Sequence, residues 1–90
     1  MNLYFDTEFT GLHKDTTLIS IGIISDDNRL FYAELNDYDK SQVNEWLQEN
    51  VINNLRYNNK NIFKAESGYN LAIKGNLKEV SEALKEWIGQ

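Results

Sequence analysis

The sequence of residues 4–12 is YFDTEFTGL, and this stretch decides how the chain is interpreted. It is an apolar run that carries two carboxylates two residues apart, Asp6 and Glu8. Because side chains alternate between the faces of a strand, a strand over residues 3–8 places both carboxylates on one face. Neighbouring like charges repel and a half-buried carboxylate loses solvation, and a divalent cation removes both penalties. Asp6 and Glu8 are therefore candidate ligands for Mg²⁺ or Mn²⁺, which prefer oxygen ligands.

The composition limits the size and the partners of the protein. Its 90 residues make one domain at most, and 41% of them are apolar, enough for a small core. The chain has no Cys, which excludes disulfides and thiolate metal sites and fits a cytoplasmic location. No apolar run approaches the ~20 residues that span a bilayer, so no membrane contact is expected. The net charge is −5, whereas proteins that neutralise many phosphates are usually basic. Any nucleic-acid contact is therefore expected to be short, local and metal-mediated.

Hydrophobic periodicity predicts a single domain of mixed α/β class. The turn signal at residues 26–28 joins two strands into a hairpin, and a capping-box pattern precedes each of two helices. Trp46 and Trp87 lie on the apolar stripes of these helices and are expected in the core. The expected elements are strands over 3–8, 17–25 and 29–35, helices over 40–55 and 77–88, and a minor hairpin over 62–74.

The N-terminal stretch also resembles a known family. An apolar residue followed by Asp-Thr-Glu-Phe-Thr-Gly-Leu is similar to the first motif of the DEDD family of 3′-5′ exonucleases. The similarity continues in LISIGII at 18–24 and in DDNRLFYA at 26–33. The similarity is closest to the small exoribonuclease-like branch of bacteria and phages, and it extends over residues 1–58 and the last helix. It implies a partial RNase H-like fold. In that fold a three-stranded antiparallel sheet, in the order 3-2-1, carries both helices.

The resemblance implies a catalytic site at the first motif. In this family four acidic groups hold two metal ions that hydrolyse a phosphodiester bond. Asp6 and Glu8 match the first two acidic groups, as catalytic residues and as ligands of Mg²⁺ or Mn²⁺. Phe9, through its backbone, and Thr10 match positions that contact the sugar at the 3′ end of RNA or single-stranded DNA, and Leu12 matches a residue under its base.

The second and third acidic motifs of the family are not present in the sequence. Residues 1–90 are therefore expected to form one domain that corresponds to the N-terminal half of an RNase H-like exonuclease. Either the sequence is a truncated version of a longer nuclease, or a short protein has kept half the fold and lost the activity. His13, the single His, does not match the catalytic His of the missing motif and is expected in a solvent-facing loop.

Two functions remain open at this stage. The first is a metal-dependent 3′-5′ exonuclease that is inactive as these 90 residues. The second is a non-catalytic binding or inhibitor protein, in a phage for example, that acts on a nucleic-acid enzyme or a host defence complex. In either case the strand over residues 3–8 lacks one neighbour. It is expected to pair with a second copy or a protein partner, unless the hairpin over 62–74 covers it.

Overall fold

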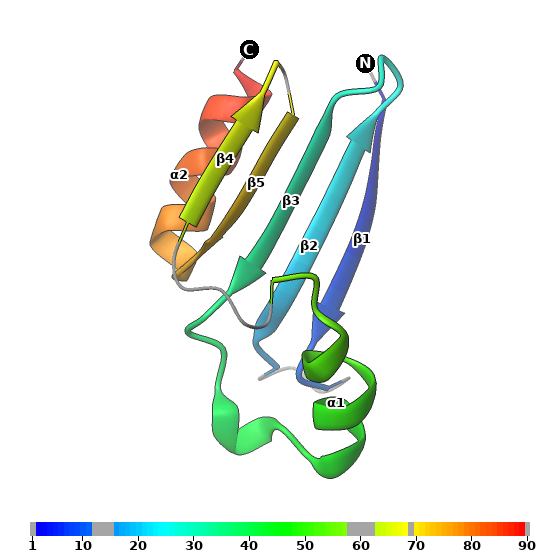
Figure 1. The fold of residues 1–90 in the computed structure, drawn as a ribbon, viewed down its shortest axis with the longest axis vertical. Helices are drawn as coiled ribbons and strands as arrows, with labels where there is room; N and C mark the ends of the chain where they lie inside the picture. The colour runs from blue at the N-terminus through cyan, green and yellow to red at the C-terminus, as the bar shows by residue number, and fades with distance from the viewer. Residues whose placement is uncertain (1, 12–15, 58–62, 69, 90) are drawn as a thin grey trace.

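The computed structural model describes residues 2–11, 16–57, 63–68 and 70–89. Its core element is a five-stranded mixed sheet with the strand order β1-β2-β3-β5-β4 (Figure 1). β3 and β5 are parallel, and the other neighbouring strands are antiparallel. The strands are β1 Leu3–Phe9, β2 Leu18–Ser25, β3 Leu30–Leu35, β4 Phe63–Ser67 and β5 Asn70–Gly75.

The α/β class is confirmed, but the prediction of a three-stranded antiparallel sheet is wrong. The first three strands do adopt the expected antiparallel order. The minor hairpin also forms, as β4 and β5, and it extends the sheet because β5 pairs in parallel with β3. This register sets Leu71 beside Phe31 and Ile73 beside Ala33. The added strands therefore bury apolar side chains that an isolated hairpin would expose to water.

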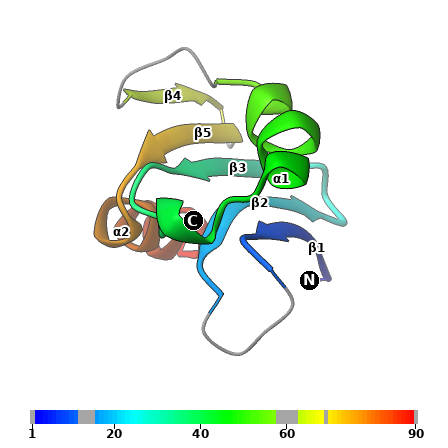
Figure 2. The same ribbon diagram turned by 90° about the horizontal axis from the view of Figure 1, so that it is seen from below.

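The hydrophobic core lies between the sheet and a single helix. α2 spans Leu77–Ile88, as predicted, and Asn76 and Glu79 form a complete capping box at its start. The helix contacts β3 and β5, and Figure 2 shows it on one side of the sheet, opposite the side on which α1 lies. Trp87 is 1% exposed, as predicted for a core residue, and its ring lies 5.7 Å from that of Phe31. We call this side of the sheet the helix face.

The predicted helix over residues 40–55 is broken into three short pieces. These are the 3-10 helix η1 Lys40–Gln42, the α-helix α1 Glu45–Asn50 and the 3-10 helix η2 Ile52–Asn54. Val43 has extended backbone angles, and the Asn44 side chain caps a new helix by accepting a hydrogen bond from the Leu47 amide.

The break also corrects two packing predictions. α1 packs against η2 near the strand ends rather than across the sheet (Figure 1), so only α2 covers the described strands. In the short helix Leu47 is the buried residue, and Trp46, predicted in the core, is 64% exposed. None of the helices in the described part of the chain is long and apolar enough to cross a membrane.

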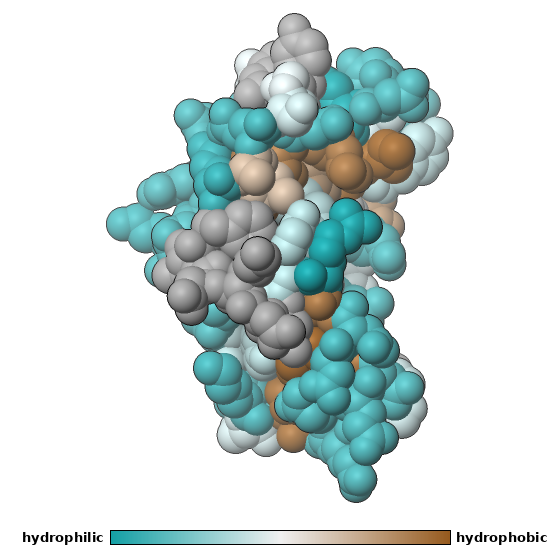
Figure 3. All heavy atoms as spheres, in the orientation of Figure 1, coloured by the Kyte–Doolittle hydropathy of each residue, from teal (hydrophilic) through white to brown (hydrophobic). Residues whose placement is uncertain are grey.

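On the other side of the sheet no helix of the described residues packs along the strands, and we call this side the open face. It faces the viewer in Figure 1 and bears the side chains that alternate with those of the core. Its residues are Tyr4, Asp6, Glu8, Ser20, Gly22, Ile24, Leu30, Tyr32, Glu34, Ala65, Ser67, Asn70, Ala72 and Lys74. Figure 3 shows this side with apolar surface between hydrophilic borders.

Candidate functional site

The first-motif carboxylates lie together on the open face. Phe5 is paired with Ile23, a core residue of the helix face, so Asp6 and Glu8 point to the opposite side. The sequence had predicted a half-buried pair, but both residues are exposed. The reason is the position of β1, which is an edge strand with β2 as its neighbour in the described sheet. Exposure removes the desolvation argument for a cation, and the mutual repulsion of two neighbouring carboxylates remains.

Strand register shows which residues share the open face with this pair. One row across the sheet runs from Asp6 through Gly22 and Tyr32 to Ala72 and Ala65. Gly22 contributes no side chain to this row, and the Tyr32 ring lies beside it, 3.9 Å from where a Cβ would be.

The next row runs from Glu8 through Ser20 and Glu34 to Lys74. Glu34 is two strands from Glu8, about 10 Å away at the usual spacing of strands. Within the described residues, no group of three or more His, Cys, Asp or Glu side chains could hold a metal ion.

The residues after the carboxylates hold the end of β1 in place. Thr10 is buried, and its hydroxyl donates to Gln42 Oε1 at 2.5 Å and accepts from the Thr17 amide at 2.9 Å. Phe9 follows an irregularity in the β1–β2 register and is exposed. A sugar contact by the Thr10 hydroxyl would therefore have to displace Gln42, a partner that the sequence did not indicate. Leu12 and His13 lie outside the described residues.

A buried carboxylate with polar partners lies in the same row as Glu8, two strands away from it. Glu34 is fully buried, and its Oε2 accepts hydrogen bonds from the Tyr32 hydroxyl at 2.7 Å and from the Tyr57 amide at 2.9 Å. Lys74 Nζ donates to the carbonyl oxygen of Tyr57 at 2.9 Å. Side chains of the neighbouring strands β3 and β5 thus hydrogen-bond to the backbone N–H and C=O of Tyr57, and we call this arrangement the Tyr57 clamp. Glu34 Oε1 has no hydrogen-bond partner among the described residues.

The clamp also affects the ionisation of Tyr32. Burial raises the pKa of Tyr32 above its usual value, and the hydrogen bond and negative charge of Glu34 raise the pKa further. Arg56 lowers the pKa of Tyr32, first through a backbone hydrogen bond and then through the charge of its guanidinium, which lies 5.6 Å from the centre of the Tyr32 ring. Sequence reasoning missed Glu34, although a carboxylate inside the otherwise apolar strand LFYAEL was a visible signal.

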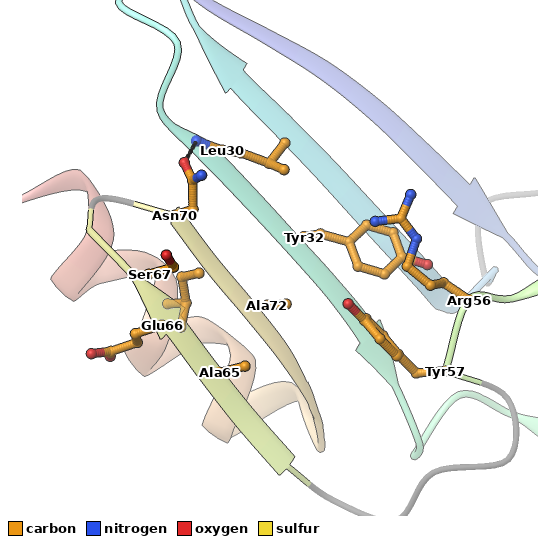
Figure 4. A pocket seen from close by; sticks show the side chains of 10 residues that line it. Leu30, Tyr32, Arg56, Tyr57, Ala65, Glu66, Ser67, Asn70 and Ala72 are labelled. Atoms are coloured by element: carbon orange, nitrogen blue, oxygen red, sulfur yellow. Dashed lines mark hydrogen bonds between the residues drawn. The ribbon is translucent and has the colours of Figure 1, made fainter.

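The clamp builds one wall of a pocket on the open face (Figure 4). The Tyr57 and Tyr32 rings lie 5.8 Å apart. Across from them, Ala65 and Ala72 form a floor without long side chains, and Ser67 and Asn70 lie at one end. The pocket has a volume of about 200 Å³. It begins in the same row as Asp6, so the carboxylate pair and the pocket open onto one surface.

Comparison with known proteins gives a partial relationship. No protein-family model matches the chain. A 3′-5′ exoribonuclease, found in two strains of Mycobacterium tuberculosis, is 33% identical over 52 residues. These residues are 58% of this chain and only 31% of the length of that enzyme. The chain therefore has a distant nuclease-family relationship that is confined to about a third of the related proteins.

Proposed function

We propose that the chain descends from DEDD-type 3′-5′ exonucleases with an RNase H-like fold, and that it corresponds to the N-terminal half of such a domain. The observation that carries the proposal is the pairing of Asp6 and Glu8 on one face of β1, within a chain that resembles a 3′-5′ exoribonuclease. The two carboxylates fit a divalent cation of the Mg²⁺ or Mn²⁺ type as half of a donor set. In the complete site such a cation would activate water or stabilise the leaving oxygen.

These 90 residues alone are expected to lack exonuclease turnover. The two-metal mechanism of the family needs four acidic groups, and the described residues bring only Asp6 and Glu8 together. The roles of the chain's own groups are then limited to holding a cation and, at Phe9 and Thr10, to contacting the sugar of a 3′ end.

The test is shortening of a 3′-labelled single-stranded RNA or DNA oligonucleotide in Mg²⁺ or Mn²⁺. The wild-type chain is expected to leave the label intact, as are the Asp6→Asn variant and the control Glu49→Gln, which neutralises an exposed carboxylate of α1. Metal-dependent shortening that Asp6→Asn abolishes and Glu49→Gln preserves would overturn the proposed inactivity. It would mean that a second chain or another acidic residue completes the site.

A second candidate function, a binding protein, is favoured by the free edge of β1. The hairpin β4–β5 covers β3 and leaves β1 at the edge of the described sheet. The Asp26 amide donates to the Asn2 carbonyl, so even-numbered residues of β1 face β2. The backbone groups of Leu3, Phe5 and Thr7 therefore face outward, available to another strand.

We propose that a second copy of the chain pairs there in an antiparallel manner, centred on Phe5. This register sets Phe5 against Phe5 and Tyr4 against Asp6, and brings no two carboxylates directly opposite each other. Centring on Asp6 instead would oppose two carboxylates, which is unfavourable. Sedimentation should detect self-association that Phe5→Lys abolishes and Trp46→Lys preserves, since the two rings are 62% and 64% exposed. A wild-type monomer, or association that survives Phe5→Lys, would exclude this pairing.

A further inference from the structure

The pocket beside the Tyr57 clamp has the chemistry of a nucleobase site. Its floor consists of Ala65 and Ala72, whose side chains end at Cβ, and one wall is the aromatic ring of Tyr57 (Figure 4). The Arg56 guanidinium, which lies over the Tyr32 ring, is the cation nearest this wall. Ser67 and Asn70 line the far end, where the Asn70 Oδ1 accepts a hydrogen bond from the Leu30 amide at 3.0 Å. A flat ring with polar edges, attached to an anion, matches these features.

The backbone of Tyr57 is held in place before any ligand binds, which favours binding of a small ligand. Glu34 and Lys74 hold the backbone N–H and C=O of Tyr57 rather than its ring. The backbone that carries the ring is therefore already ordered, and a ligand that stacks on the ring does not have to order it.

The pocket and the carboxylate pair lie on the same face of the sheet, a short distance apart. Asp6, Gly22, Tyr32 and Ala72 lie in one row of the open face, so Asp6 and Ala72 are three strands apart, about 14 Å at the usual strand spacing. This separation is suited to a flexible single strand of a few nucleotides that has its 3′ end at Asp6.

We propose that this pocket binds a base of single-stranded nucleic acid, a few nucleotides before the 3′ end that reaches Asp6 and Glu8. The inference rests on the proposed function, because it takes the carboxylate pair as the position of the 3′ end. Binding comes mainly from stacking, because the chain is acidic and offers few cations for phosphates. Lys64, near the pocket, already pairs with Glu66 at 3.1 Å. Because Arg56 provides one phosphate contact, a plot of the logarithm of the affinity against the logarithm of the salt concentration should have a slope of only about −0.7.

The experiment is an NMR titration of the whole chain with a pentameric oligoadenylate in EDTA, with ribose 5-phosphate as the probe without a base. The amides of Ala65, Asn70 and Ala72 should shift with oligoadenylate and not with ribose 5-phosphate. Tyr57→Leu should weaken binding roughly 5- to 100-fold, the usual effect of losing one stacked base. Tyr57→Phe keeps the ring and should bind normally, as should Trp46→Leu, which removes an exposed aromatic ring elsewhere.

Several results would overturn the proposal. Equal shifts with ribose 5-phosphate would reveal an anion site at Arg56, and stronger shifts with N-acetyl-tryptophanamide would reveal a site for an aromatic peptide side chain. Absence of shifts at Ala65 and Ala72, or unchanged binding by a folded Tyr57→Leu variant, would exclude the base site. Because the titration contains no metal, its outcome is separate from that of the nuclease proposal, which is tested at Asp6.

Discussion

Replacing Glu34 with alanine should destabilise the protein by roughly 2–5 kcal/mol and release the Tyr57 clamp. The substitution removes the acceptor for two donors, the Tyr32 hydroxyl and the Tyr57 amide. A buried donor that loses its acceptor costs about 1–3 kcal/mol, and both tyrosines are only partly exposed, so water replaces Glu34 incompletely. The loss is a large fraction of the roughly 5–15 kcal/mol that stabilises a typical domain.

The assay is urea denaturation of the wild type and three variants. Tyr32→Phe removes one donor and leaves the Tyr57 amide bonded to Glu34, so it should cost only about 1 kcal/mol. Glu34→Gln keeps an acceptor oxygen and places an amide group where Glu34 Oε1 has no partner in the described structure. It should cost less than half as much as Glu34→Ala.

Amide exchange gives a second readout of the clamp. The Tyr57 amide should exchange faster in Glu34→Ala than in Tyr32→Phe, because only the first substitution removes its acceptor. A free energy of unfolding for Glu34→Ala within about 0.5 kcal/mol of the wild-type value would contradict this prediction, because a change that small is typical of an ordinary surface position. Equal losses for Glu34→Ala and Glu34→Gln would also refute it, because the acceptor would then contribute nothing.

Three further predictions follow from individual contacts. Mn²⁺ should broaden NMR signals around residues 6–8 with millimolar affinity, since two carboxylates leave most of the metal's water in place; broadening centred on residues 26–27 would contradict the site. The raised pKa of Tyr32 means that its contribution to stability is complete below the unfolded pKa of about 10 and is lost as pH rises above it. Tyr32→Phe should therefore flatten the decline of stability at high pH, and an unchanged slope would show that Tyr32 is not responsible. Asn76→Ala should lower the free energy of unfolding in urea by about 1 kcal/mol, because it removes the capping box of α2. A value equal to that of the wild type would mean that water satisfies the end of the helix as well as Asn76 does.

The elements that depend only on residues close together in the sequence were predictable. α2 followed from its apolar stripe and from the pair Asn76 and Glu79, and the hairpins followed from alternation and turn residues. The parallel pairing of β3 with β5 was not predictable in this way. It depends on where the chain travels between residues 36 and 62, and no local pattern encodes that path.

The same division applies to the candidate site. The shared face of Asp6 and Glu8 follows from the two-residue period of a strand, and the structure agrees with it. Their exposure depends on the edge position of β1, which is a property of the whole sheet. The Tyr57 clamp was missed because Glu34 and Tyr57 are 23 residues apart, and residues 40–55 between them were expected to form one helix.

Gly22 lies in β2, where the surroundings differ between the two faces of the sheet. On the helix face, the neighbours of Gly22 in β2 are Ile21 and Ile23, which pack in or against the core. On the open face, a Cβ at position 22 would lie 3.9 Å from Tyr32 Cδ1, an ordinary contact distance, so packing does not require glycine here. Glycine within a strand also costs up to about 1 kcal/mol relative to alanine. Both observations favour a side chain at position 22, and the packing of the described residues gives no reason for the glycine.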